Sequence, residues 1–166
     1  LPLSAVLLPE FMYEAFESRS EELGNFGHGF TYSGHPVCAA VALKNLEIME
    51  ETNLFEHAKS VGNLLESGLR AFKDYPFVGE VRGKGLIGAV ELVKNKTPRE
   101  PFEASFGMGA FCSLACQEEG LIVRNVGDVI AFCPPLIITE SQIAELLSKF
   151  EIGLNKTVEW ANKEMS

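Results

Sequence analysis

The sequence predicts a chain of the α/β class, in which a small, mainly antiparallel sheet in the carboxyl-terminal part is covered by helices on one face. Apolar residues alternate with polar ones over 77–93, which is the period of half-buried strands. Two further apolar stretches flank Gly127-Asp128, a pair typical of a hairpin turn. Apolar residues recur at helical spacing over 54–72 and 141–163, so two amphipathic helices can cover such a sheet.

The composition is typical of a folded protein that does not bind polyanions. Of its 166 residues, 46% are hydrophobic, which is enough for a packed core. The formal net charge is −9, and a chain of this sign repels nucleic-acid backbones and anionic lipid surfaces. No stretch has the roughly 20 apolar residues that a membrane-spanning helix needs. We therefore expect neither a nucleic-acid partner nor a membrane partner.

The cysteines predict a reducing setting, which we take to be the cytoplasm. Four of them stand at positions 38, 112, 116 and 133, with no Cys-x-x-Cys pair. Cys112 and Cys116 lie four apart on a predicted helix, but the histidines are too sparse to complete a zinc site. We expect small buried thiols and no metal.

The first 35 residues are expected to be the tail of a larger domain. Ser4–Leu8 is a short apolar run typical of a buried strand, but no partner strand is evident within the chain. Helical spacing follows over 10–18, and 19–35 is a polar, glycine-rich loop. The opening at Leu1 lacks the basic start of a signal peptide. We therefore expect this chain to be a piece of a longer protein that begins inside one of its domains.

Residues 36–74 are expected to be helices that connect two domains. Pro36–Met49 has helical spacing, and its uncharged stretch Val37–Leu43 must be enclosed by other structure. A second, amphipathic helix continues to Phe72. The remaining residues, 75–166, then form the carboxyl-terminal small domain.

The small domain is predicted to hold four short strands and two helices. Gly120 stands where the first helix should end, in the C-cap position, and Thr139 or Ser141 can cap the second. The strands are expected at Phe77–Arg82, Leu86–Val93, Leu121–Asn125 and Val129–Cys133, and the helices at Phe106–Glu119 and Ser141–Lys163, with a loop over 94–105.

The richest candidate site is the segment 27–36, Gly-His-Gly-Phe-Thr-Tyr-Ser-Gly-His-Pro. Its glycines permit close approach to the backbone, and its hydroxyls and free amide groups precede a helix start, where a phosphate is stabilised. A plain capping loop, with Ser33 or His35 as the cap, is the alternative that composition favours. His28 and His35 have no cysteine or carboxylate at ligand spacing, so we expect neither a metal nor a general base there.

Two arginines are the other candidates. The segment 82–85, Arg-Gly-Lys-Gly, is too short for a phosphate-binding loop, and we interpret it as a turn with a structural arginine. Arg124 ends the apolar run Leu121–Val123. Its guanidinium either lies in solvent at the rim of the sheet, which the residues alone favour, or receives a carboxylate as a bidentate fork. Glu80 and Glu91 are interpreted as ordinary strand faces.

Three blocks of the sequence resemble the class III, pyridoxal-phosphate-dependent aminotransferases, most of all the ω-amino acid:pyruvate group. The blocks are HGFTYSGHPVCAAVAL, VGEVRGKGLIGAVELV and GLIVRNVGDVIAFCPPLIIT, in the order and spacing of that family. The resemblance spans residues 1–163. It implies a fold-type-I transferase of which this chain is the carboxyl-terminal part, with 1–35 as the tail of the large cofactor-binding domain.

The resemblance implies roles for individual residues. Thr31 matches the threonine that binds the cofactor phosphate of the neighbouring subunit, which implies a homodimer. Phe30 matches an aromatic residue that lines the same cofactor site. Arg124 matches the mobile arginine that receives a substrate carboxylate and swings away for an uncharged amine. Arg82 matches a position that supports the turn of the small domain.

The Schiff-base lysine of the family has no counterpart here. It lies a few residues before the strand that matches Pro2–Pro9, and neither Lys44 nor Lys84 takes its place. We therefore expect no catalytic residue in this chain. Pyridoxal 5′-phosphate is implied for the full-length enzyme, whereas the fragment alone is expected to be inactive and not to bind it.

The implied reaction moves an amino group from an amine or ω-amino acid to a keto acid such as pyruvate. An aminomutase or a lyase of the same cofactor family is one alternative. A non-catalytic dimerisation or binding module is the other.

Overall fold

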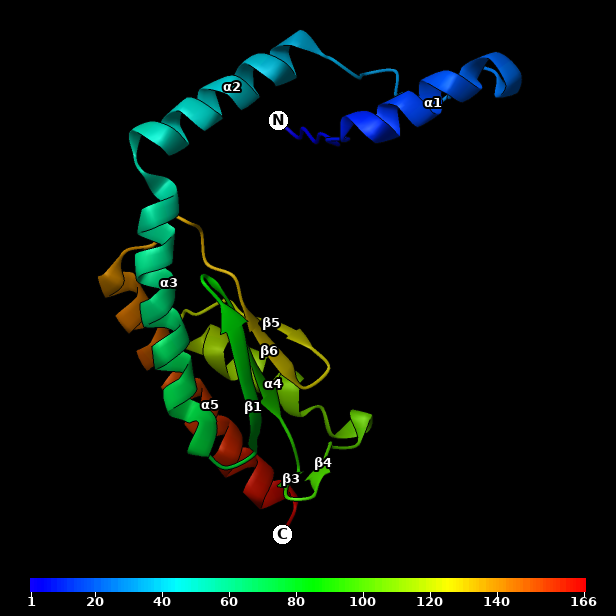
Figure 1. Ribbon diagram of the computed structural model, residues 1–166. Coiled ribbons are helices and arrows are strands. Elements are labelled where there is room, and N and C mark those ends of the chain that lie inside the picture. The colour runs from blue at the N-terminus through cyan, green and yellow to red at the C-terminus, as the bar shows by residue number, and fades with distance from the viewer. The chain divides into compact units, whose positions relative to one another are not determined.

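The computed structural model describes all 166 residues, which form two compact units. The amino-terminal unit is Leu1–Thr52 and the carboxyl-terminal unit is Asn53–Ser166. Figure 1 traces their helices and strands along the chain. None of the helices combines the length and the apolar character that crossing a membrane requires.

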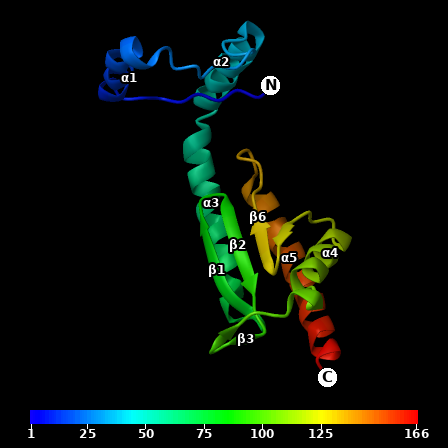
Figure 2. The ribbon, with the colours of Figure 1, turned by 90° about the vertical axis from the view of Figure 1, so that its right-hand side faces the viewer.

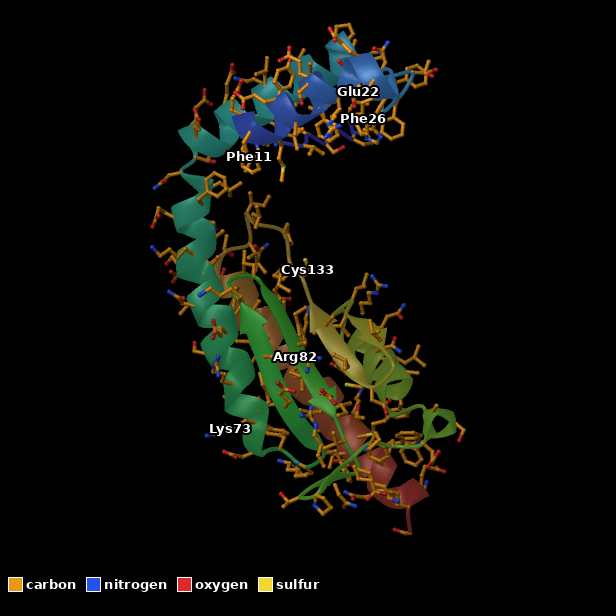
Figure 3. The ribbon with its side chains drawn as sticks, turned by 45° about the vertical axis from the view of Figure 1, so that its right-hand side comes forward. Phe11, Glu22, Phe26, Lys73, Arg82 and Cys133 are labelled. Atoms are coloured by element: carbon orange, nitrogen blue, oxygen red, sulfur yellow. The ribbon has the colours of Figure 1, made fainter.

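The amino-terminal unit consists of two helices without a buried core. Helix α1 spans Glu10–Leu23 and α2 spans Pro36–Glu51, and neither contains a buried residue. The stretch Val37–Leu43, expected to be enclosed, is mostly exposed within this unit. The ring of Phe26, labelled in Figure 3, has its centroid 4.8 Å from that of the Phe16 ring on α1.

The strand predicted at Ser4–Leu8 is wrong for this structure. These residues have no regular secondary structure and are exposed. A strand needs a neighbour that accepts and donates its ladder hydrogen bonds, and the amino-terminal unit contains no strand. The apolar run is therefore present without the partner that would make it part of a sheet.

The loop predicted over 19–35 begins later than expected. Helix α1 continues to Leu23 because 19–23 are good helix formers, and Arg19 pairs with Glu22 at 2.9 Å. Gly24 ends the helix at a φ of 80°, a conformation that favours glycine, and its N–H donates to the carbonyl of Ser20.

The carboxyl-terminal unit contains a four-stranded antiparallel sheet in the order β1-β2-β6-β5. The predicted antiparallel sheet is confirmed, but the strand predicted at Leu121–Asn125 begins only at Arg124, and the other strand ends differ by one or two residues. Residues 94–105, predicted to be a loop, also contain a small second hairpin. The strands are β1 (Val78–Lys84), β2 (Ile87–Leu92), β5 (Arg124–Val126), β6 (Val129–Phe132), and the short pair β3 (Asn95–Lys96) and β4 (Arg99–Glu100).

Helices cover one face of this sheet (Figure 2). Along β2, Gly88, Val90 and Leu92 are buried on the helix side, whereas Ala89 and Glu91 lie on the opposite, open face and are half-buried. The covering elements are α3 (Leu54–Arg70), the short 3-10 turn η1 (Ala71–Asp74), α4 (Met108–Glu118), which follows a second 3-10 turn η2 (Ala104–Phe106), and α5 (Glu140–Glu164).

The core lies between the sheet and the helices. Phe150 on α5 is fully buried, and its ring packs edge-on against Phe72 and Phe132 at centroid distances of 5.1 and 4.9 Å. At the end of α4, Gly120 has a φ of 77°, and the N–H of Leu121 donates to the carbonyl of Cys116. This is the glycine C-cap that the sequence predicts.

Replacing the cap residue Thr139 by alanine should lower the free energy of unfolding by about 1 kcal/mol. Thr139 Oγ1 accepts from the N–H of Gln142 at 3.3 Å, and Gln142 Oε1 accepts from the N–H of Thr139 at 2.9 Å. Urea unfolding followed by circular dichroism measures the loss. Ser141→Ala is the comparison: its hydroxyl contacts Thr139 Oγ1 at 3.0 Å but accepts from no backbone N–H, so its loss should change stability less. Equal losses would place the cap elsewhere.

Candidate functional site

Thr31 lies in a tight turn just before α2. The N–H of Phe30 donates to Ser33 Oγ at 3.1 Å, and the N–H of Ser33 donates back to the carbonyl of Phe30 at 2.9 Å. These two bonds fix the turn around Thr31 and Tyr32. Thr31 is exposed, and its hydroxyl and amide make no hydrogen bond within the chain.

This turn can accept a phosphate. No atom comes within 4 Å of a methyl group placed on Gly27, Gly29 or Gly34, so the backbone is open to an approaching anion. Helix α2 begins one residue after His35, with Pro36 in its first turn, and no side chain caps its free N–H groups. The unbonded hydroxyl and amide of Thr31 are donors of the type that holds a phosphate oxygen. The donor set therefore fits a phosphorylated cofactor.

Phe30 is exposed beside the same turn. Its ring stands edge-on to the ring of His28, with the ring centroids 5.6 Å apart. Both residues are exposed. The structure brings Phe30 and Thr31 together and places Arg124 in the other unit.

Arg124 is the first residue of β5, directly opposite Ala131 on β6. Residues directly opposite in an antiparallel pair project to the same face. Since Ile130 and Phe132 are buried on the helix side, Ala131 and Arg124 lie on the open face. Arg124 is exposed and forms no ion pair within the chain, so its guanidinium is free to receive a carboxylate.

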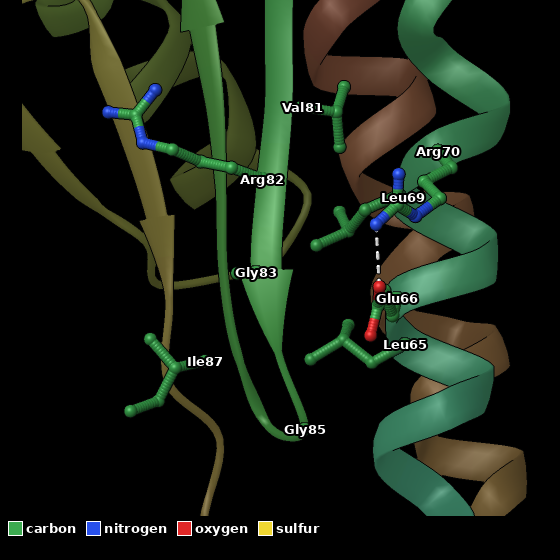
Figure 4. Close-up of a pocket in the computed structure, with 10 residues that line it drawn as sticks. Leu65, Glu66, Leu69, Arg70, Val81, Arg82, Gly83, Gly85 and Ile87 are labelled. Atoms are coloured by element: carbon green, nitrogen blue, oxygen red, sulfur yellow. Dashed lines mark hydrogen bonds and ion pairs between the residues drawn. The ribbon is translucent and has the colours of Figure 1, made fainter.

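Arg82 lies within β1, not in the turn that it was predicted to support. The turn itself, Gly85-Leu86, follows Lys84, and Gly85 takes a φ of 59°. In Figure 4 the Arg82 side chain points away from Leu65 and Leu69 of α3, which places it on the open face of the sheet. The ion-pair partners of Arg82 therefore lie on the strands and not in the turn.

An ion-pair cluster of two arginines and two glutamates surrounds Arg82 on the open face. Arg82 contacts Glu91 at 2.9 Å and Glu80 at 3.3 Å. Arg99, at β4, contacts Glu80 at 2.9 Å and also pairs with Glu91. The hydrogen bond from Arg99, followed by the charges of Arg82 and Arg99, holds the pKa of the Glu80 carboxyl below its usual value.

The sequence prediction missed this cluster because it treated Glu80 and Glu91 as separate strand faces. Alternate residues of a strand share a face, so Glu80 and Arg82 lie on one face of β1, and Ala89 and Glu91 lie on one face of β2. The register of the hairpin pairs Glu80 with Glu91 and Arg82 with Ala89, which brings the four residues to the same face. Arg99 has no such signal, because it reaches the cluster from a segment predicted to be a loop.

Two of the cysteines are buried on one helix, and one lysine of α2 is held in an ion pair. Cys112 and Cys116 are buried on α4, and the hydrogen bond with Cys112 together with burial raises the pKa of the Cys116 thiol, which keeps it protonated. Lys44, on α2, is paired with Glu47 at 2.9 Å. No group of three histidine, cysteine, aspartate or glutamate side chains is arranged to hold a metal ion.

Comparison with known proteins identifies the family of this chain. Residues 1–154 match the family model of class-III aminotransferases. A probable γ-aminobutyrate transaminase 3, mitochondrial, from Oryza sativa subsp. indica is 42% identical over 159 residues, which cover 96% of this chain and 31% of that protein. A γ-aminobutyrate transaminase 2 from Solanum lycopersicum is 40% identical over 157 residues, 95% of this chain and 34% of that protein.

Solved structures of transaminases share the fold. One, a transaminase with L-Ala, superposes with a TM-score of 0.86 at 44% identity, covering 92% of this chain and 36% of that one. A thermostable ω-transaminase mutant from Pseudomonas jessenii gives a TM-score of 0.82 at 48% identity, covering 89% and 33% of the two chains. The chain spans about a third of the length of these relatives. Since the family match covers nearly all of its residues, this chain belongs to the class-III aminotransferases.

Proposed function

We propose that this chain is the carboxyl-terminal part of a pyridoxal-phosphate-dependent aminotransferase that moves an amino group from an amine or ω-amino acid to a keto acid such as pyruvate. The observation that carries the proposal is Arg124, an unpaired guanidinium on the open face of the sheet. Such a group is suited to a substrate carboxylate, and no acid in the structure neutralises it. The bound cofactor supplies an aldehyde and an electron sink for the amino transfer.

The residues of this chain would bind and orient. Thr31 donates its hydroxyl and amide to the cofactor phosphate of the neighbouring subunit, so the working enzyme is a homodimer. Phe30 lines that cofactor site and limits the access of water. Arg124 holds the carboxylate of the keto acid as a bidentate fork and moves aside for an amine that lacks a carboxylate.

The 166-residue chain alone is proposed to be inactive, and not to bind the cofactor, because none of its lysines occupies the position of the Schiff-base residue. A cytoplasmic location is proposed from its four unpaired cysteines, although the rice relatives are named mitochondrial. We also propose that the large-domain tail ends at residue 35 and that the small domain begins after residue 74.

Replacing Arg124 by alanine in the complete enzyme should raise the KM for a keto acid about ten- to hundredfold, because a charge-assisted hydrogen-bond pair is lost. The KM for a simple amine should change little, since that substrate has no carboxylate. Initial rates with pyruvate and with a primary amine measure both. Arg124→Lys keeps the charge but not the fork and should lie between. Equal loss for both substrates would refute the assigned role.

A further inference from the structure

Residues 94–100 form a small flap at one end of the sheet, built from β3, β4 and the turn between them (Figure 1). Every residue of the flap is exposed, whereas Val93 before it and Phe102 just beyond it are buried. The N–H of Val93 donates to the carbonyl of Phe77 at 2.7 Å. The ring of Phe102 stacks on that of Phe106, with the centroids 4.9 Å apart. The flap is therefore attached to the core at both of its ends and exposed in between.

The flap is held in shape by bonds of its own. The N–H of Lys94 donates to the carbonyl of Glu100 at 2.8 Å. Strand β3 pairs with β4 in register, and the side-chain amide of Asn95 donates to the Glu100 carboxylate. Because these bonds lie within the flap, it can move away from the sheet as one hairpin without losing them.

Two side chains make all the hydrogen bonds and ion pairs between the flap and the rest of the unit. Arg99 pairs with Glu80, at 2.9 Å, and with Glu91. Lys96 Nζ donates to the carbonyl of Lys73 at 3.1 Å. Both contacts are polar and lie at the surface, where water can replace them.

The cluster beneath the flap is arranged so that Arg99 can leave it. Arg82 contacts the same two carboxylates, Glu91 at 2.9 Å and Glu80 at 3.3 Å. Neither glutamate is left without a cation if Arg99 withdraws. The Arg99 side chain is already 44% exposed, so water can hydrate its guanidinium. Release therefore does not leave an unpaired charge buried in the protein, which would be costly.

Charge attracts the flap to the rest of the chain. Its basic side chains are Lys94, Lys96 and Arg99, its one acidic side chain is Glu100, and the net charge of the chain is −9. Salt screens the attraction between exposed charges, over about 10 Å at 0.1 M and about 3 Å at 1 M. The hold on the flap thus depends on ionic strength.

We propose that the flap 94–100 is closed by a salt-sensitive latch, in which Arg99 holds it over Glu80 and Glu91. Release of Arg99 lets the flap move away from the sheet about Val93 and Phe102 while the core stays folded. In the open state Arg82 alone neutralises the two carboxylates. Opening and closing need neither cofactor nor substrate, so the latch is independent of the proposed function.

Limited trypsin digestion of the 166-residue chain measures the opening, because a hairpin must leave its closed form to enter the cleft of a protease. Mass spectrometry identifies the cuts after Lys94 and Lys96, inside the flap. Arg99→Gln should raise the rate of these two cuts about three- to tenfold. Arg70→Gln is the matched control, since it also removes an exposed, ion-paired arginine, which contacts Glu66 on α3, and it should leave the flap cuts unchanged.

Arg82→Gln separates a latch from general loosening of the sheet. Without Arg82, Arg99 is the only cation between Glu80 and Glu91, so the flap should be cut no faster than in the native chain. The cut after Lys84, the last residue of β1, reports on the sheet itself. It should stay slow in Arg99→Gln.

A salt series on the native chain is the second test, and it decides alone if Arg99→Gln does not fold. Raising NaCl from about 0.05 to about 0.5 M should speed the flap cuts of the native chain about threefold and leave those of Arg99→Gln unchanged, with rates normalised to a small peptide substrate. A native rate that does not respond to salt would overturn the proposal. So would a native-like rate in Arg99→Gln, flap cuts that rise only together with the cut after Lys84, or a faster flap cut in Arg82→Gln.

Discussion

Replacing Phe150 by alanine should lower the free energy of unfolding of the carboxyl-terminal unit by about 3–5 kcal/mol. The side chain is 0% exposed and lies between the sheet and the helices. Its ring packs against Phe72 in η1 and against Phe132 on β6. Because the two contacting rings come from two different elements, the cavity left by truncation cannot close by moving one side chain.

Urea unfolding of the 166-residue chain, followed by the fluorescence of its single tryptophan, Trp160 on α5, measures the loss. Phe55→Ala is the matched control, since Phe55 is on α3 of the same unit but 67% exposed. We expect the control to change stability by about 0.5 kcal/mol or less. A loss at Phe150 no larger than this would mean that α5 does not pack on the sheet as described.

The layered unit was predictable because each of its elements has a local signal. The alternation over 77–93 and the Gly127-Asp128 turn determine the strands and one register, and the αL cap at Gly120 determines where α4 ends. Tertiary pairing between β2 and β6 has no such signal, because residues far apart in sequence meet there. The order of the sheet, and hence the placement of Arg82 and Arg124 on its two edge strands, could only come from the structure.

In the amino-terminal unit, a local sequence signal was not enough to predict the structure. The run Ser4–Leu8 has the composition of a buried strand, but it is irregular because a strand depends on a partner. Residue types predict an anion site in the loop before Pro36, but the roles of Thr31 and Arg124 come from family resemblance. The hydroxyl of Thr31 and the guanidinium of Arg124 have no partner within the chain. The ion pairs of Glu91 with Arg82 and Arg99 were missed, since they depend on which side chains share one face of the sheet.

Replacing Gly109 by alanine should both destabilise the carboxyl-terminal unit and move the hairpin that carries Arg124. A methyl group at Gly109 would collide with the carbonyl oxygen of Gly127 and lie 2.9 Å from the Cα of Asp128. Both neighbours are backbone atoms of the turn between β5 and β6, so no side-chain rotation relieves the overlap. Overpacking of this kind costs about 1–3 kcal/mol, and urea unfolding measures it.

The same substitution strains the contact by which α4 holds the hairpin. The N–H of Gly109 donates to Asp128 Oδ1 at 2.9 Å, which ties the start of α4 to the turn three residues after Arg124. If the hairpin position sets the reach of Arg124, Gly109→Ala should also weaken keto-acid use by the complete enzyme more than amine use. Gly27→Ala adds the same methyl group where it meets no atom within 4 Å and should leave unfolding unchanged. If Gly109→Ala were as stable as the native chain, the start of α4 and the hairpin would not be in contact. Other contacts would then have to fix the position of the hairpin that carries Arg124.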